Sequence, residues 1–115
     1  MQAIAEPARL DRMFFALADA YRRGMLDRLS RGPASVSELA EALGIALPSA
    51  VKHLAVLVEG GFVASRKSGR VRTYTAEPKA FDAMEAWVAK RKNLLNAQFD
   101  QLDAYLAEQK GKATP

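Results

Sequence analysis

The chain of 115 residues contains no cysteine, and this absence excludes several kinds of chemistry at once. Without thiols there is no disulfide, iron–sulfur cluster, thiolate metal site or cysteine nucleophile. His53 is the only histidine, so a histidine-rich metal site within one chain is excluded as well. We therefore expect neither a metal site nor a cofactor.

Long apolar runs and the short motifs of common enzymes are also absent. No apolar run approaches the roughly 18 residues of a membrane span, and the first residues lack the basic start and apolar segment of a signal peptide. There is no glycine-rich phosphate loop or nucleophile elbow. The sequence therefore predicts a cytoplasmic protein that is not an enzyme and does not contact a membrane.

Half of the residues are apolar and 26% are charged, as in an ordinary globular fold, and the length allows one domain, residues 1–115. Acidic residues are nearly missing from one third of the chain. Residues 42–76 contain one, Glu59, whereas the remainder holds 12 residues of each sign. The whole net charge of +4 lies in this third, where a polyanion would dock, although a solvated charged face is the alternative. Its five basic residues are Lys52, Arg66, Lys67, Arg70 and Arg72.

Two helices are predicted in the first 32 residues. Apolar residues at three- and four-residue spacing indicate the first over residues 8–17. Asp19 is a cap for the second, which ends before Gly32. Met25, Leu26 and Leu29 are its expected buried side, and its expected exposed side is made of Arg22, Arg23, Asp27 and Arg28.

The next two helices form a pair around a glycine turn. Ser35 and Glu38 match a capping box, and Gly44 supplies the positive φ that closes this short third helix. The fourth begins near Leu47, where Pro48 is tolerated in the first turn, and ends at Gly60-Gly61. Two helices joined in this way within residues 35–54 are typical of a helix-turn-helix.

A β-hairpin with a basic tip follows, from β-prone runs at 62–67 and 71–76 around a Ser-Gly turn. Residues 79–110 then form one long helix without glycine or proline, about 48 Å long, whereas a compact chain of this size is about 35 Å across. Its apolar stripe predicts a second copy packed against it; a helix kinked back on its own domain is the alternative. Residues 111–115 are expected to be a flexible tail.

A helix-turn-helix followed by a basic hairpin is the pattern of a winged helix, and several segments make the resemblance specific. The chain resembles the ArsR/SmtB-type winged helix-turn-helix regulators from about Leu10 to Leu106. Residues 16–29 are similar to the opening of that family, and residues 35–44 and 52–57 to its helix-turn-helix. Gly61-Phe62-Val63, Gly69-Arg70 and Tyr74 are similar to its wing. Leu47-Pro48 and the last helix, with Trp87, Leu102 and Tyr105-Leu106, resemble the branch without metal-binding cysteines.

The resemblance implies a fold that is mainly α with one β-hairpin, and a homodimer joined through the first and last helices. It implies a transcriptional repressor that binds double-stranded DNA at an operator with two-fold pseudosymmetry. The positions of the family's sensing cysteines fall within residues 38–42, which here are leucine, alanines and carboxylates, and the last helix has no histidine. Metal-responsive control is therefore not expected, and a small-molecule effector stays unidentified.

From helix phase and from the resemblance together, we expect two sets of site residues. Arg22 or Arg23 is expected near phosphates. The expected DNA-binding residues are Ser49, Val51, Lys52, His53, Arg66, Lys67, Arg70 and Arg72. The expected dimer-interface residues are Leu10, Met13, Phe14, Trp87, Leu95, Phe99, Leu102 and Leu106.

Two positions depart from the family pattern and leave alternatives open. Val51 stands where the family usually has serine, and either touches a thymine methyl group or lies at the edge of the core. Ala46 replaces the usual serine cap.

A winged-helix module that binds proteins rather than DNA is the alternative function. It would be favoured by a neutral or acidic charge on the wing and on the second helix of the helix-turn-helix.

Overall fold

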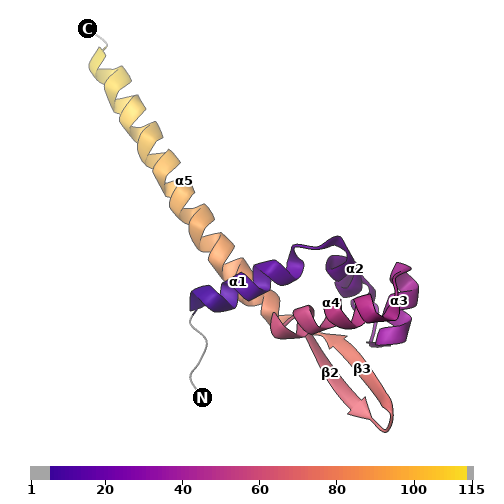
Figure 1. Cartoon of the computed structure of the whole chain (residues 1–115). Helices are drawn as coiled ribbons and strands as arrows, with labels where there is room; N and C mark the ends of the chain where they lie inside the picture. Colours follow the sequence, from indigo (N-terminus) through magenta and orange to yellow (C-terminus); the bar gives the residue numbers. More distant parts are fainter. Residues whose placement is uncertain (1–5, 114–115) are drawn as a thin grey trace. The chain divides into compact units, whose positions relative to one another are not determined.

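The computed structural model describes residues 6–113, which form two compact units. The first ends at Asp82 and the second begins at Ala83, within the last helix. Figure 1 shows the order of the elements along the chain. They are α1 (Glu6–Leu17), α2 (Ala20–Leu29), β1 (Ala34–Ser35), α3 (Val36–Leu43), α4 (Leu47–Glu59), β2 (Val63–Ser68), β3 (Val71–Ala76) and α5 (Lys79–Ala113).

The helix boundaries follow from local capping chemistry. The Asp19 carboxylate accepts hydrogen bonds from the backbone N–H groups of Tyr21 (2.9 Å) and Arg22 (3.2 Å), at the start of α2. Ser35 and Glu38 form a complete capping box at α3, and Gly44 closes that helix with φ of 66°. These features match the sequence prediction, because each depends only on neighbouring residues.

The core of the first unit lies where α1, α2, α3 and α4 meet. Its largest fully buried side chains are Phe62, Met13, Met25, Leu39, Leu54 and Leu57. Gly60, at the end of α4, lies so close to α1 that a Cβ atom there would be 2.9 Å from the Cβ of Ala16. A side chain at position 60 would therefore separate the two helices.

The sheet has three strands in the order β1-β3-β2, all antiparallel. The β2–β3 hairpin runs from the pair Val63–Ala76 to the turn after Ser68–Val71, as predicted. The prediction of a single hairpin missed β1, which adds the pairs Ala34–Tyr74 and Ser35–Thr73. A strand of two residues has no alternating pattern to recognise, so only the folded partner strand reveals it.

The last helix, α5, runs without interruption from Lys79 to Ala113, about 52 Å at 1.5 Å per residue. It continues through Gly111 to Ala113, three residues beyond the predicted end, whereas the rest of the predicted tail, residues 114 and 115, lies outside the described residues. No single helix within residues 6–113 is long and apolar enough to cross a membrane; α3 and α4 meet that test only as a pair bent by 110°.

Candidate nucleic-acid interface

A helix-turn-helix is formed by α3 and α4. The two helices are bent by 110° across the turn at Gly44, within the usual range for this motif. Ala50, Leu54 and Leu57 bury one side of α4 in the core. The core therefore fixes which side of α4 is left for a ligand.

The outward side of α4 carries three of the expected DNA-binding residues. Ser49 and Lys52 are exposed, and Val51 is 52% exposed. The exposure of Val51 decides against a place at the edge of the core, which was the alternative from the sequence. Two further apolar residues of α4, Leu47 and Val58, are also exposed. Helical spacing places Val58 on the core side with Leu54 and Leu57, and its 42% exposure corrects that prediction.

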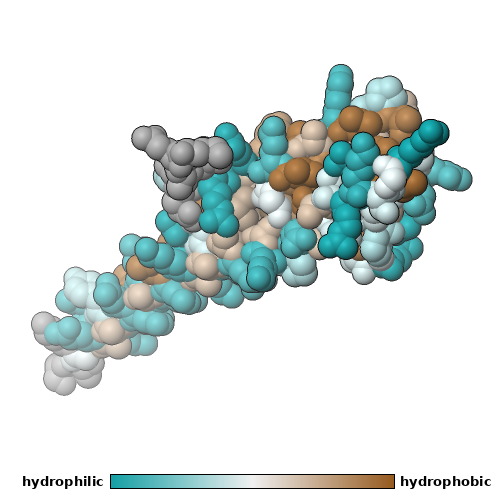
Figure 2. Space-filling model, turned by 90° about the horizontal axis from the view of Figure 1, so that it is seen from below, coloured by the Kyte–Doolittle hydropathy of each residue, from teal (hydrophilic) through white to brown (hydrophobic). Residues whose placement is uncertain are grey.

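The β2–β3 hairpin, hereafter the wing, extends away from α4 and carries the remaining basic residues (Figure 1). Arg66, Lys67 and Arg70 are exposed and form no ion pair with any described residue. Arg72 donates a hydrogen bond to the hydroxyl of Ser65 at 2.9 Å, across the two strands. On the face that Figure 2 shows, hydrophobic residues (brown) lie beside hydrophilic residues (teal). The wing thus presents exposed cations that no carboxylate of residues 6–113 neutralises in an ion pair.

The structure corrects the expectation that Arg22 lies near phosphates. Arg22 is only 7% exposed, and its Nε and Nη2 donate hydrogen bonds of 2.7 Å to the carbonyls of Ala16 and Phe15. Its guanidinium also lies over the ring of Phe15, 5.0 Å from the ring centre. Because these contacts hold the cation inside the fold, Arg22 caps the end of α1 rather than binding DNA.

Arg23 is exposed but also bonded to α1, through a 2.7 Å hydrogen bond from Nη1 to the carbonyl of Leu17. His53 is half-buried between α4 and α2, its side chain 21% exposed. Its Nδ1 lies 3.3 Å from Arg22 Nη1 and 3.9 Å from the Asp19 carboxylate. Because the Nδ1 side of the ring faces Arg22 and Asp19, only the other atoms of the His53 ring remain for the expected DNA contact.

Asp19 joins these residues to the start of α2. The pKa of its carboxyl is lowered from the ordinary 3.8, chiefly because the backbone N–H of Arg22 donates to it, and His53 adds a smaller effect. The cluster of Asp19, Arg22 and His53 therefore fastens α4 to α2. The sequence did not predict it, although Arg22 has the helical phase of the buried residues Met25 and Leu26.

The expected dimer-interface residues divide between α1 and α5. On α1, Leu10 is half-buried and Phe14 is 38% exposed, but Met13 is 2% exposed and belongs to the core, which corrects its assignment. On α5, Trp87 is half-buried, and the Arg91 guanidinium lies 4.4 Å from its ring centre. The other four expected residues of α5 are at least half exposed: Leu95, Phe99, Leu102 and Leu106.

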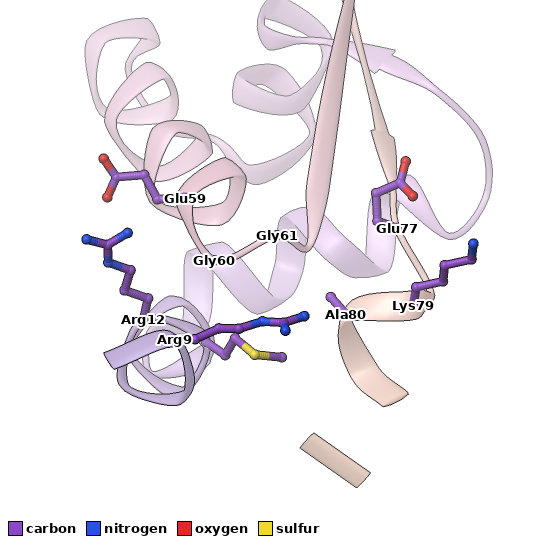
Figure 3. A pocket seen from close by; sticks show the side chains of 9 residues that line it. Arg9, Arg12, Glu59, Gly60, Gly61, Glu77, Lys79 and Ala80 are labelled. Carbon is purple, nitrogen blue, oxygen red and sulfur yellow. The ribbon is translucent and has the colours of Figure 1, made fainter. Parts of the chain in front are cut away.

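A pocket of about 470 Å³ lies between α1, the end of α4 and the residues that follow the wing. Figure 3 shows Arg12 and Glu59 on one side of it, Glu77 and Lys79 on the other, and Arg9 reaching between them. Its lining carries three cations and two carboxylates, so it does not continue the uniformly basic surface of the wing.

Comparison with known proteins agrees with this arrangement. Residues 17–66 match the family described as "Helix-turn-helix domain". The chain is 39% identical over 74 residues to the HTH-type transcriptional regulator Rv2034 of Mycobacterium tuberculosis, covering 64% of this chain and 69% of that protein. It is 37% identical over 79 residues to the arsenical resistance operon repressor of Escherichia coli, covering 68% of this chain and 64% of that protein.

Solved structures extend the likeness over most of the chain. The crystal structure of the ArsR family transcriptional regulator RHA00566 is 47% identical, with a TM-score of 0.74, and the match covers 82% of this chain and 97% of that one. A homodimeric winged helix-turn-helix DNA-binding domain from Mycobacterium bovis, Mb0332, is 27% identical, with a TM-score of 0.61 over 82% of this chain and 94% of that one. These relatives are transcriptional regulators and not enzymes, as the sequence predicted. The chain therefore belongs to the ArsR family of winged helix-turn-helix, DNA-binding transcriptional regulators.

Proposed function

We propose that the chain is a homodimeric repressor that binds an operator with two-fold pseudosymmetry and does not respond to metal ions. One observation carries the proposal: α4 and the wing together expose five basic side chains, while the same stretch of chain contains a single carboxylate. Such a surface suits the phosphates of a DNA duplex, with α4 in the major groove and the wing beside the backbone.

Dimerisation is supported by the exposed apolar side of α5. Leu95, Phe99, Leu102 and Leu106 recur at three- and four-residue spacing, so they share one side of the helix. An apolar side of this length is unfavourable in water and suits a second copy of the same helix. Two protomers related by a two-fold axis would present two α4 helices to two half-sites.

Independence from metal ions is supported by the composition of the chain. It has no cysteine, and thiolates are the ligands that soft metal ions prefer. Within residues 6–113 no three His, Asp or Glu side chains come close enough to hold a metal ion. Operator binding should therefore be the same with and without added Zn²⁺, Hg²⁺ or arsenite.

Selection of binding sites from a random DNA pool with the purified chain tests the proposal. We expect paired half-sites with a spacing of about one helical turn. The logarithm of the binding constant should fall with the logarithm of salt by about 0.9 per phosphate neutralised. Arg70→Ala should reduce the slope by about one such unit, whereas Arg31→Ala, an exposed arginine outside residues 42–76, should leave it unchanged.

Failure to enrich any sequence at low salt would overturn the proposal and favour a protein-binding module. Enrichment of a single half-site would contradict only the two-fold symmetry of the operator.

A further inference from the structure

The recognition helix α4 carries exposed apolar residues on its outward side, beside the polar Ser49 and Lys52. Leu47 is 46% exposed and Val51 is 52% exposed, one helical turn apart. Pro48 and Ala55 on the same helix are exposed too. A surface helix normally turns polar residues outward, so this apolar strip, defined here as Leu47 and Val51, is expected to be covered by a ligand.

The charge of the same third of the chain, residues 42–76, identifies the occupant as a polyanion. Lys52 follows Val51 directly on α4, and Arg66, Lys67 and Arg70 of the wing are exposed without an ion-pair partner among the described residues. An apolar protein partner would have to cover these charges as well as the strip. Duplex DNA can bind the cations through its phosphates and cover the apolar strip with the base edges that lie between the phosphates.

Only one base edge in the major groove offers an apolar group, the C5-methyl group of thymine. The other major-groove groups are hydrogen-bond donors and acceptors, which leucine and valine side chains cannot satisfy. Leu47 and Val51 lie in the N-terminal half of α4, the part of a recognition helix that reaches the bases. Their separation along the helix axis is about 6 Å, or nearly two base-pair steps of 3.4 Å.

We infer that Leu47 and Val51 read thymine methyl groups at two nearby positions of each half-site. The inference rests on the proposed function and adds the chemical basis of its specificity. Lys52 and Ser49 supply the polar contacts beside the strip, and the wing supplies contacts to phosphate. We therefore expect thymines in the selected half-site at the base pairs that face Leu47 and Val51, whose side chains cannot form hydrogen bonds with a base.

Deoxyuridine replaces thymine without changing base pairing, so it tests the methyl group alone. Each thymine of the selected half-site is replaced in turn, and the dissociation constant is measured by fluorescence anisotropy. At a contacted position we expect about fourfold weaker binding, the effect of one buried methyl group. Thymines outside the half-sites serve as the matched DNA control and should show no change.

Val51→Ala in the protein should remove the sensitivity to deoxyuridine at one position and leave it at the other. If the losses from deoxyuridine and from Val51→Ala are not additive at that position, Val51 contacts the thymine methyl group there, as in a double-mutant cycle. Val58→Ala is the matched control, because Val58 is 42% exposed on the same helix but lies near its C-terminal end. Both replaced side chains are exposed, so the variants should fold normally.

Tight, sequence-specific binding that is unaffected by deoxyuridine everywhere in the half-site would overturn the inference and leave the proposed function standing. So would sensitivity that persists at both positions in Val51→Ala and in Leu47→Ala. Absence of any sequence-specific binding by the wild-type chain would instead overturn the proposed function.

Discussion

Arg22 shows how a single charged residue becomes structural. Its guanidinium donates to the carbonyls of Phe15 and Ala16, in the last turn of α1, where helix carbonyls lack partners within the helix. Arg23 does the same for Leu17. The two arginines of α2 therefore end α1, and the loop between the helices is fixed by side-chain hydrogen bonds.

Arg22→Ala should lower the free energy of unfolding by about 3 kcal/mol, since each hydrogen bond to a charged group contributes about 1.5–3 kcal/mol. The Ala16 carbonyl would lose the donor that caps it, whereas the Phe15 carbonyl would keep the backbone N–H of Ala18 at 3.1 Å. Urea denaturation followed by circular dichroism measures the change. Arg23→Ala is the matched control and should cost about 1 kcal/mol, because Arg23 is exposed and makes one such bond. Equal stability of Arg22→Ala and the wild type would contradict the capping role.

The burial of Arg22 was predictable in part from the sequence. Arg22, Met25, Leu26 and Leu29 follow the spacing of one helix side, and all four are buried. The sequence interpretation placed Arg22 on the wet side because of its charge. Its acceptors could not be predicted, because they are backbone atoms of another helix and appear only when α1 and α2 pack.

At the scale of elements, the caps of α2 and α3 link stability to pH. The pKa of Asp19 is lowered chiefly by the Arg22 backbone N–H, and the pKa of Glu38 chiefly by the Ser35 backbone N–H. A carboxyl whose pKa is lower in the folded state stabilises the fold above its ordinary pKa, here 3.8 and 4.5. That stabilisation is lost as the pH falls through the lowered value.

We therefore expect the free energy of unfolding to be steady near neutral pH and to decrease as the pH falls below about 4.5. The double variant Asp19→Asn, Glu38→Gln should weaken this dependence, because neutral amides still accept the capping hydrogen bonds without titrating. Urea denaturation at a series of pH values measures it. Asp100→Asn, which removes an exposed carboxylate from the middle of α5, away from both ends of that helix, is the control. An unchanged pH profile in the double variant would contradict the assignment.

The close approach of α1 to the end of α4 gives a second prediction for the elements. Gly60→Ala would place a Cβ 2.9 Å from Ala16 Cβ and 3.3 Å from the Arg12 carbonyl, in buried surroundings. We expect a loss of about 1–3 kcal/mol of stability from overpacking, measured by thermal or urea denaturation.

Gly24→Ala is the matched control for Gly60→Ala. Its Cβ would lie 2.8 Å from Leu43 Cδ2, the end of a flexible side chain that can change rotamer at little cost, whereas Gly60 meets a backbone carbonyl and another Cβ. Alanine also favours the α2 helix. A stable Gly60→Ala protein would show that the two helices separate without cost.

Elements were predicted well where local chemistry defines them and poorly where it does not. The ends of α2, α3 and α4 follow from Asp19, Ser35, Gly44 and the glycines after Glu59. Strand β1 was missed because it exists only by pairing with Tyr74 and Thr73. Likewise, Met13 has the spacing of an interface residue, and only the packed core shows that its side is the inner one.

At the scale of the whole molecule, assembly depends on what covers α5. The spacing of its apolar residues was visible in the sequence, and the described structure leaves Leu95, Phe99, Leu102 and Leu106 at least half exposed. A protomer with this much exposed apolar surface is expected to associate. The sequence of one chain cannot fix the partner surface, since that surface is formed only in the assembly.

The double variant Leu95→Glu, Phe99→Glu should convert the proposed dimer to a monomer, because two carboxylates per helix would face their counterparts in a buried apolar interface. Sedimentation equilibrium measures the mass, and the paired operator should then be bound far more weakly, since each half-site is held by a single wing and α4. Ala97→Glu, Ala104→Glu adds the same charge to exposed positions on the opposite side of α5 and should stay dimeric. A dimeric Leu95→Glu, Phe99→Glu protein would place the dimer contact elsewhere.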